Sequence, residues 1–90
     1  MKFEWNEDKR QQNLTKHGVD FLDAALIFES ETLSRQDDRE DYGEVRFASL
    51  GLVDGVPYVV IHTERGDTTR LISAWMGGRR DYDRYKNSFP

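Results

Sequence analysis

The chain has 90 residues and no cysteine, so a disulfide framework, a thiolate nucleophile and a Cys-based zinc site are excluded. Its length fits a single domain over residues 1–90 with one modest hydrophobic core. Only two His are present and no carboxylates are spaced to complete a metal site, so we expect neither a metal nor a cofactor. The formal net charge is −4, whereas nucleic-acid-binding domains are more often basic.

The charge is unevenly distributed along the chain. Residues 29–44 carry seven acidic side chains against two Arg, and residues 65–86 carry six basic side chains against three Asp. Because the local field matters more for phosphate binding than the total charge, a basic site remains possible. No apolar run approaches the roughly 18 residues of a membrane span. The first residues also lack the apolar core of a signal peptide, so we expect a cytoplasmic protein with no membrane contact.

The N-terminal third predicts a short strand followed by a helix. Residues 3–5 alternate between apolar and polar side chains, as in an edge strand. Asn6 is a typical N-cap, and the acidic residues that follow it favour the positive end of a helix dipole. We expect the helix to continue to His17 and to end at Gly18, which suits the left-handed position after a helix.

A second helix is predicted directly after the first. Asp20 is its expected N-cap, and Val19 and Ala24 occupy the positions of a hydrophobic staple. Within residues 21–28 the apolar side chains recur at helical spacing, so this segment should bury one face.

From residue 32 onward the pattern changes to the period of β-strands. We expect a short strand at 32–35, a charged loop at 37–41, and strands at 44–53, 58–63 and 68–75. Asp54-Gly55 predicts a hairpin, residues 65–67 a second turn, and residues 79–86 a short C-terminal helix. Short turns between successive strands give an antiparallel meander, and the two N-terminal helices can cover one of its faces.

Strand alternation assigns side chains to the two faces of this sheet. Arg46 should share a face with Ala48 and Leu50, and Arg70 should share a face with Ile72 and Ala74. His62 lies inside an apolar strand, so we interpret it as a buried, hydrogen-bonded core residue.

Three blocks of residues together resemble a known family. They are Lys9…Asn13-Leu14…Lys16-His17-Gly18-Val19…Phe21, then Gly43-Glu44…Arg46, then Arg70-Leu71-Ile72-Ser73-Ala74. In order and spacing they resemble the BrnT toxins, small RelE-like ribonucleases encoded beside a BrnA antitoxin, over nearly the whole chain. The resemblance implies a RelE-like α+β fold, with two N-terminal helices packed on a four-stranded antiparallel meander sheet and a short C-terminal helix.

The resemblance also implies an activity. A BrnT-like toxin would be a metal-independent endoribonuclease that blocks translation, in which the ribose 2′-OH attacks the adjacent phosphate. On this hypothesis Arg70 and Arg46 bind the scissile phosphate, because a guanidinium can contact two phosphate oxygens at once. Glu44 or His17 would transfer the proton. Tyr85 would assist at the catalytic site, where its phenol could hydrogen-bond a phosphate or stack on a base. Contacts to RNA are expected from Lys9, Lys16, Arg79 and Arg80.

Each of these side chains also has a structural interpretation. Arg46 and Arg70 could be surface residues paired with Glu44 or Glu64. Lys16 and His17 could only complement the negative end of the helix dipole. Tyr85 could pack the terminal helix onto the sheet, while Lys9 and Asn13 could only orient the first helix.

The chain departs from the family pattern after Ala74. Family members usually continue with an Arg, then a basic and an Ala position, whereas here Trp75-Met76-Gly77-Gly78 follow. Trp75 could stack on an RNA base or, with Met76, dock an antitoxin helix. The implied partner is a BrnA-like antitoxin in a 2:2 heterotetramer, with DNA contacted only through the antitoxin. The alternative hypothesis is a weakened toxin that acts as a binding module through antitoxin binding and co-repression.

Overall fold

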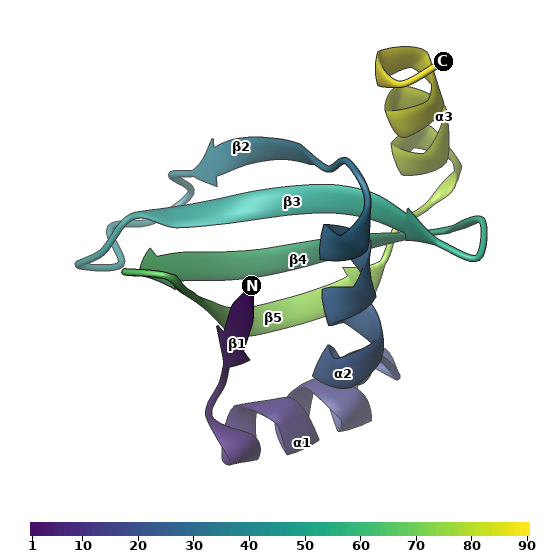
Figure 1. Ribbon diagram of the computed structural model, residues 1–90. Helices are drawn as coiled ribbons and strands as arrows, with labels where there is room; N and C mark the ends of the chain where they lie inside the picture. Colours follow the sequence, from purple (N-terminus) through teal and green to yellow (C-terminus); the bar gives the residue numbers. More distant parts are fainter.

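The computed structural model describes all residues, 1–90, and shows an α+β fold with a twisted central sheet (Figure 1). The elements in chain order are β1 (Lys2–Glu4), α1 (Glu7–His17), α2 (Phe21–Ala24), the 3₁₀ helix η1 (Ala25–Glu29), β2 (Leu33–Asp37), β3 (Arg46–Val53), β4 (Val56–Arg65), β5 (Thr68–Met76) and α3 (Arg79–Ser88). None of the helices combines the length and apolar character that crossing a bilayer requires.

The sheet has five strands, not the four that the sequence predicted. Its strand order is β1-β5-β4-β3-β2. Strands β2 to β5 form the expected antiparallel meander, but β1 adds to the free edge of β5 in parallel orientation, with Phe3 opposite Thr69. The sheet is therefore mixed. The meander could be predicted because short turns connect its strands, whereas the partner of a three-residue strand lies some 65 residues away and leaves no local signal.

The local start and stop signals of α1 are confirmed. The Asn6 side chain accepts a hydrogen bond from the Lys9 amide at 3.1 Å. Gly18 has a φ of 69° and donates its amide to the Leu14 carbonyl at 2.9 Å. The hairpin at Asp54-Gly55 is confirmed as well, because both residues have positive φ angles as a tight two-residue turn requires.

The second helix is shorter than predicted. After one α-helical turn in α2, the chain tightens into η1, so the expected single helix over 21–28 is wrong in detail. Asp20 does cap α2 by accepting from the Leu22 amide at 3.0 Å, and Arg10 of α1 holds the same carboxylate with two hydrogen bonds at 2.9 and 3.0 Å. Ile27 is fully buried, but Leu22 stays 56% exposed.

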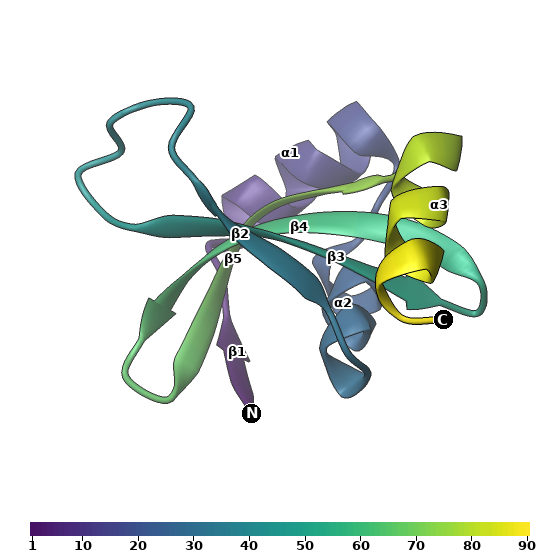
Figure 2. The ribbon, with the colours of Figure 1, turned by 90° about the horizontal axis from the view of Figure 1, so that it is seen from above.

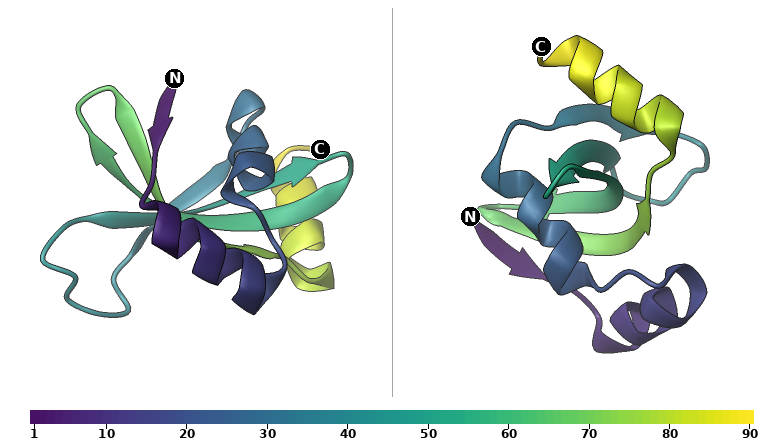
Figure 3. Two further views of the ribbon diagram at one scale, coloured as in Figure 1. Left: turned by 90° about the horizontal axis from the view of Figure 1, so that it is seen from below. Right: turned by 90° about the vertical axis from the view of Figure 1, so that its right-hand side faces the viewer.

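Apolar side chains fill both sides of the sheet. On the side covered by α2 and η1, the buried cluster is Val19, Phe21, Ala24, Ile27, Val60, Leu71 and Ala74. On the other side, which we call the α3 face, it is Leu50, Val59, Ile61 and Tyr85. Figure 3 shows α2 and α3 on opposite sides of the sheet, with α1 along the edge that β5 forms.

A β-bulge in β5 overturns part of the predicted face assignment. Between Leu71 and Ser73 the register against β4 shifts by one residue. As a result Leu71 and Ala74, three positions apart, both pack on the side covered by α2, and Trp75 packs on the α3 face. The prediction that Arg70 and Ala74 share a face is therefore wrong, because an extra residue reverses the alternation.

Candidate functional site

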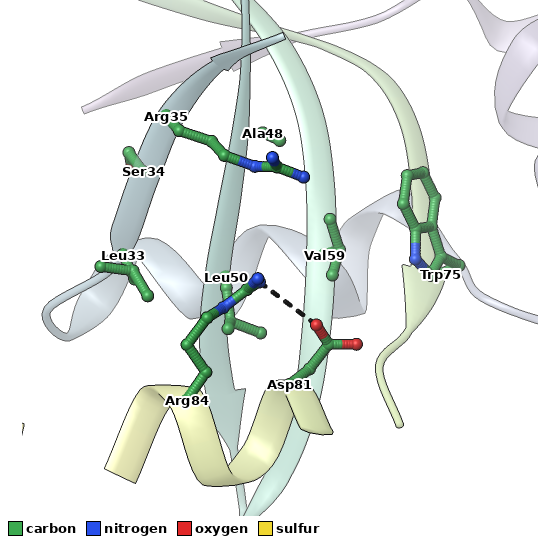
Figure 4. Close-up of a pocket in the computed structure, with 9 residues that line it drawn as sticks. All are labelled: Leu33, Ser34, Arg35, Ala48, Leu50, Val59, Trp75, Asp81 and Arg84. Carbon is green, nitrogen blue, oxygen red and sulfur yellow. Dashed lines mark hydrogen bonds and ion pairs between the residues drawn. The ribbon is translucent and has the colours of Figure 1, made fainter. Parts of the chain in front are cut away.

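Trp75 lies at the centre of a set of adjoining cavities on the α3 face, which we call the Trp75 hollow. One cavity lies between β2 and α3 and encloses about 330 Å³ (Figure 4). A wider cavity lies between the end of α1 and the end of β5 and encloses about 710 Å³. The indole of Trp75 borders both cavities and a third, smaller one. The basic side chains that line the hollow are Lys16, His17, Arg35, Arg39 and Arg84.

The C-terminal turn of α1 brings two of these basic groups to Trp75. Lys16 and His17 are both exposed and line the wide cavity together with Ser73. The centre of the His17 ring lies 6.0 Å from that of Trp75. The sequence predicted both residues as site residues, and the structure places them beside the aromatic ring that was predicted for base stacking.

Asn13 fixes the position of this helix turn against the sheet. Its amide donates to the carbonyls of Val19 at 2.9 Å and Ala74 at 2.8 Å, and its oxygen accepts from the Ala74 amide at 3.1 Å. Strand β1 pairs only with residues 68–70 of β5, so the free edge of β5 at Ala74 has the Asn13 side chain as its hydrogen-bond partner. This placement supports the structural interpretation of Asn13, one turn away from His17.

Arg39 reaches the hollow from the loop after β2. Asp37, whose side chain is 3% exposed, accepts two hydrogen bonds from the Arg39 guanidinium at 2.7 and 2.9 Å. These bonds hold the pKa of Asp37 below its usual range and raise the pKa of Arg39 further above its own. The Arg39 side chain as a whole is 62% exposed, so it places a positive charge at the rim of the hollow.

Two other arginines in the hollow were not predicted from the sequence. Arg35 extends from β2 over Ala48 towards the middle of the cavity (Figure 4), and no carboxylate lies within 4.0 Å of it. Arg84 extends from α3 and pairs with Asp81 at 3.2 Å. Arg35 was overlooked because it lies in the acid-rich segment, although its place in a strand, two residues before Asp37, was a usable signal.

Arg46 and Arg70 lie on the same face of the sheet, as the hypothesis required. The register places Thr63 of β4 between them, so their backbones are about 10 Å apart, two strand spacings. Neither residue lines the hollow. Arg46 pairs with Glu44 at 3.1 Å and lies 4.1 Å from the Tyr42 ring centre, while Arg70 lies 3.7 Å from Glu4.

The other predicted side chains lie at varying distances from the hollow. Glu44 is held between Arg46 and Arg65. Lys9 is exposed in a smaller cavity that also contains Lys16 and His17. Arg79 and Arg80 are exposed at the start of α3 and line no cavity, whereas Met76 is 58% exposed at the rim of the wide cavity.

Tyr85 does not face the hollow. Its ring is buried in the α3-face cluster, and its hydroxyl donates to the Glu31 carbonyl at 2.7 Å. This geometry supports the packing interpretation, in which Tyr85 anchors α3 to the sheet.

His62 is a buried core residue, as predicted. Its two ring nitrogens lie 2.7 Å from Ser49 Oγ and 2.7 Å from Glu64 Oε2. The order Ser-His-Glu resembles a hydrolase triad, but Ser49 is fully buried, so no substrate can reach its hydroxyl. The array instead satisfies polar groups between β3 and β4. No group of three or more His, Cys, Asp or Glu side chains is arranged to hold a metal ion.

The fold and the hollow define a class of protein. It is a small α+β domain with basic side chains around a half-buried indole, features that are common among proteins that bind single-stranded nucleic acids. The model of the BrnT family, described as the ribonuclease toxin of type II toxin–antitoxin systems, matches residues 5–80, and the chain therefore belongs to this family. The match ends before Arg84 and Tyr85. No curated protein matches the chain.

Proposed function

We propose that the chain is an endoribonuclease toxin that cleaves RNA without a metal ion at the Trp75 hollow. The observation that carries the proposal is the convergence of Lys16 and His17 from α1 and Arg39 from the β2–β3 loop on one half-buried indole, that of Trp75. Membership of a ribonuclease toxin family supports RNA as the substrate.

His17 has the chemistry for the proton transfer. An imidazole can take the proton from the ribose 2′-OH, whose oxygen then attacks the adjacent phosphorus. The bond from phosphorus to the 5′-oxygen breaks, and that oxygen leaves with a proton supplied by an acid in the site. The products are a 2′,3′-cyclic phosphate and a 5′-hydroxyl.

The basic side chains of the hollow would stabilise the charge that develops on the phosphate. Arg39 is held by a buried carboxylate, so its charge is in place before RNA binds. Lys16 adds an exposed positive charge from the last turn of α1. Arg35 forms no ion pair with a carboxylate, so no ion pair has to break before it binds a phosphate. Arg46 and Arg70 would bind phosphates further along the strand once their surface ion pairs open, with Lys9, Arg79 and Arg80 at the periphery.

The experiment is an RNA cleavage assay with the purified chain in excess EDTA. We expect cleavage that leaves cyclic phosphate ends, and a loss of at least about 100-fold in His17→Ala, the range typical of a general acid or base. Thr15→Ala, on the exposed side of the same helix, is the matched control and should cleave at the wild-type rate. An inert wild-type chain, or equal rates for the two variants, would refute the proposal.

The partner we propose is a BrnA-like antitoxin in a 2:2 heterotetramer, with operator DNA contacted only through the antitoxin. Membership of a type II toxin–antitoxin family supports an antitoxin partner. Size-exclusion chromatography with light scattering on the co-expressed pair would measure the stoichiometry.

A second candidate function is a binding module that no longer cleaves RNA. It is favoured by the ion pairs of Arg46 and Arg70 and by Trp75 at a position where the family usually has an Arg. Expression in cells separates the two functions: growth arrest that His17→Ala relieves supports the nuclease, whereas tight antitoxin binding without arrest supports the module.

A further inference from the structure

An apolar groove lies on the side of the sheet opposite the Trp75 hollow. It runs between β1 with its following residues and the α2–η1 segment, and it encloses about 560 Å³. Figure 2 shows β1 and α2 extending from the same side of the sheet. Seven of its eight lining residues are hydrophobic: Met1, Phe3, Trp5, Leu22, Ala25, Leu26 and Phe28. The eighth is Glu29.

The groove has an aromatic floor and exposed walls. On its floor Phe3 packs on Phe28 with ring centres 5.7 Å apart, and Trp5 packs edge-on against the buried Phe21 at 6.2 Å. On its walls Leu22 and Leu26 are 56% and 42% exposed. A contiguous apolar surface of this kind on a small domain marks an interaction site more often than a set of scattered exposed residues does.

The charges around the groove are acidic. Residues 18–34, which include the whole α2–η1 wall, contain four acidic side chains and no Lys or Arg; of the four, only Asp20 is paired, with Arg10 of α1. On the other wall Glu7 accepts a hydrogen bond from the Trp5 indole and is also paired with Arg10, and the nearby Lys2 is paired with Asp67. A second copy of this chain, with its net charge of −4, would on balance be repelled here. A segment with apolar anchors and flanking Lys or Arg would fit both the shape and the charge.

We propose that this groove anchors the antitoxin, through an apolar segment of the antitoxin flanked by basic residues. The proposal rests on the antitoxin partnership proposed above, and it adds that the anchor lies on the far side of the sheet from the RNA site. The antitoxin is therefore held by residues that take no part in RNA cleavage. Substitutions in the groove should separate neutralisation from cleavage.

The test measures the affinity of the co-encoded antitoxin, the product of the adjacent reading frame, for the full toxin chain by calorimetry. Leu26→Glu should weaken binding by at least about tenfold, the loss expected when a buried anchor is removed. Glu29→Lys should weaken it in a salt-dependent manner. Leu14→Glu is the matched control, since Leu14 is 40% exposed on α1 outside every cavity, and it should bind as the wild type does.

Cleavage of RNA by each free variant keeps this proposal distinct from the proposed function. Leu26→Glu should cleave RNA at the wild-type rate and melt within a few degrees of the wild type, because its side chain is already partly in water. If no variant cleaves RNA but the antitoxin affinities change as expected, the proposed nuclease activity is refuted and the proposed antitoxin groove is supported. Equal affinity of Leu26→Glu and Leu14→Glu, no affinity of the wild type, or a toxin dimer that Leu26→Glu alone dissociates would each overturn the groove proposal.

Discussion

Replacing Asn13 by Ala should destabilise the whole domain, because this side chain supplies hydrogen bonds where the sheet has no strand. The substitution removes the partners of three backbone groups: the carbonyls of Val19 and Ala74 and the amide of Ala74. The site is only 6% exposed, so water cannot easily replace the amide. At roughly 1 kcal/mol for each unsatisfied buried group, the free energy of unfolding should fall by about 3 kcal/mol.

Thermal unfolding followed by circular dichroism measures this loss. For a domain of this size about 3 kcal/mol corresponds to a fall in Tm of roughly 12–24 °C. Gln12→Ala, at the exposed neighbouring position of the same helix, should leave Tm nearly unchanged. A fall below about 4 °C in Asn13→Ala would refute the reasoning, since it would mean that the strand edge finds other partners at little cost.

Asn13→Asp provides a second and sharper test. A carboxylate keeps the acceptor for the Ala74 amide but turns two donated hydrogen bonds into repulsion from carbonyl oxygens. Near neutral pH we therefore expect a loss at least as large as that of Asn13→Ala. Stability should recover in part at acidic pH, where the protonated acid can donate one hydrogen bond again. Asn13 fixes against β5 the helix turn that carries His17. Both Asn13 variants should therefore lose RNA cleavage even at temperatures where they are still folded.

Three further predictions follow from the contacts described above. Trp75→Ala should weaken binding to single-stranded RNA by roughly 5- to 150-fold in a filter-binding assay, which is the equivalent of one lost base stack. Trp75→Phe should keep most of the affinity, so equal affinities of Trp75→Ala and Trp75→Phe would exclude stacking. The pKa of Asp37 is lowered in the folded state by Arg39, so the stabilisation from this carboxylate is present above the pKa of an unfolded Asp, about 3.9, and is lost as the pH falls through the lower folded value. Asp37→Asn should therefore lower Tm at neutral pH, and below about pH 4 its Tm should fall less steeply with decreasing pH than that of the wild type. An equally steep fall of Tm in the two proteins would contradict this role of Asp37. Gly51→Ala would place a Cβ 2.7 Å from the Ile27 Cβ and should cost about 1–3 kcal/mol in urea unfolding. Gly78→Ala meets no atom within 4 Å and should cost less, since it replaces only a favourable N-cap residue of α3.

The parts of the fold that could be predicted are those specified by neighbouring residues. The cap at Asn6, the stop at Gly18 and the turn at Asp54-Gly55 each depend on one or two side chains and their own backbone angles, and all three are confirmed. The parallel addition of β1 and the bulge in β5 depend on contacts between distant segments. The bulge is the more consequential of the two, because one extra residue decides which side chains of β5 share a face with Trp75.

The candidate site could be predicted only in part for the same reason. The family blocks pointed to Lys16 and His17, and the structure brings these two to Trp75. They also pointed to Arg46 and Arg70, which share a face but lie outside the hollow in ion pairs. Arg35 and Arg84 come from β2 and α3, whose approach to each other across the sheet is not encoded in either segment alone.

The net charge of −4 is compatible with RNA binding because the two sides of the sheet differ in charge. The acids that dominate the total include those of α2–η1, which lie around the apolar groove, and Asp37, which is buried beneath Arg39. An acidic residue that orients an arginine in this way makes the hollow more suitable for a phosphate, since it fixes the guanidinium while leaving it in contact with solvent. Total charge is therefore a poor guide to local charge in this chain, because several acids either pair with basic groups of the hollow, as Asp37 and Asp81 do, or lie around the groove on the opposite surface.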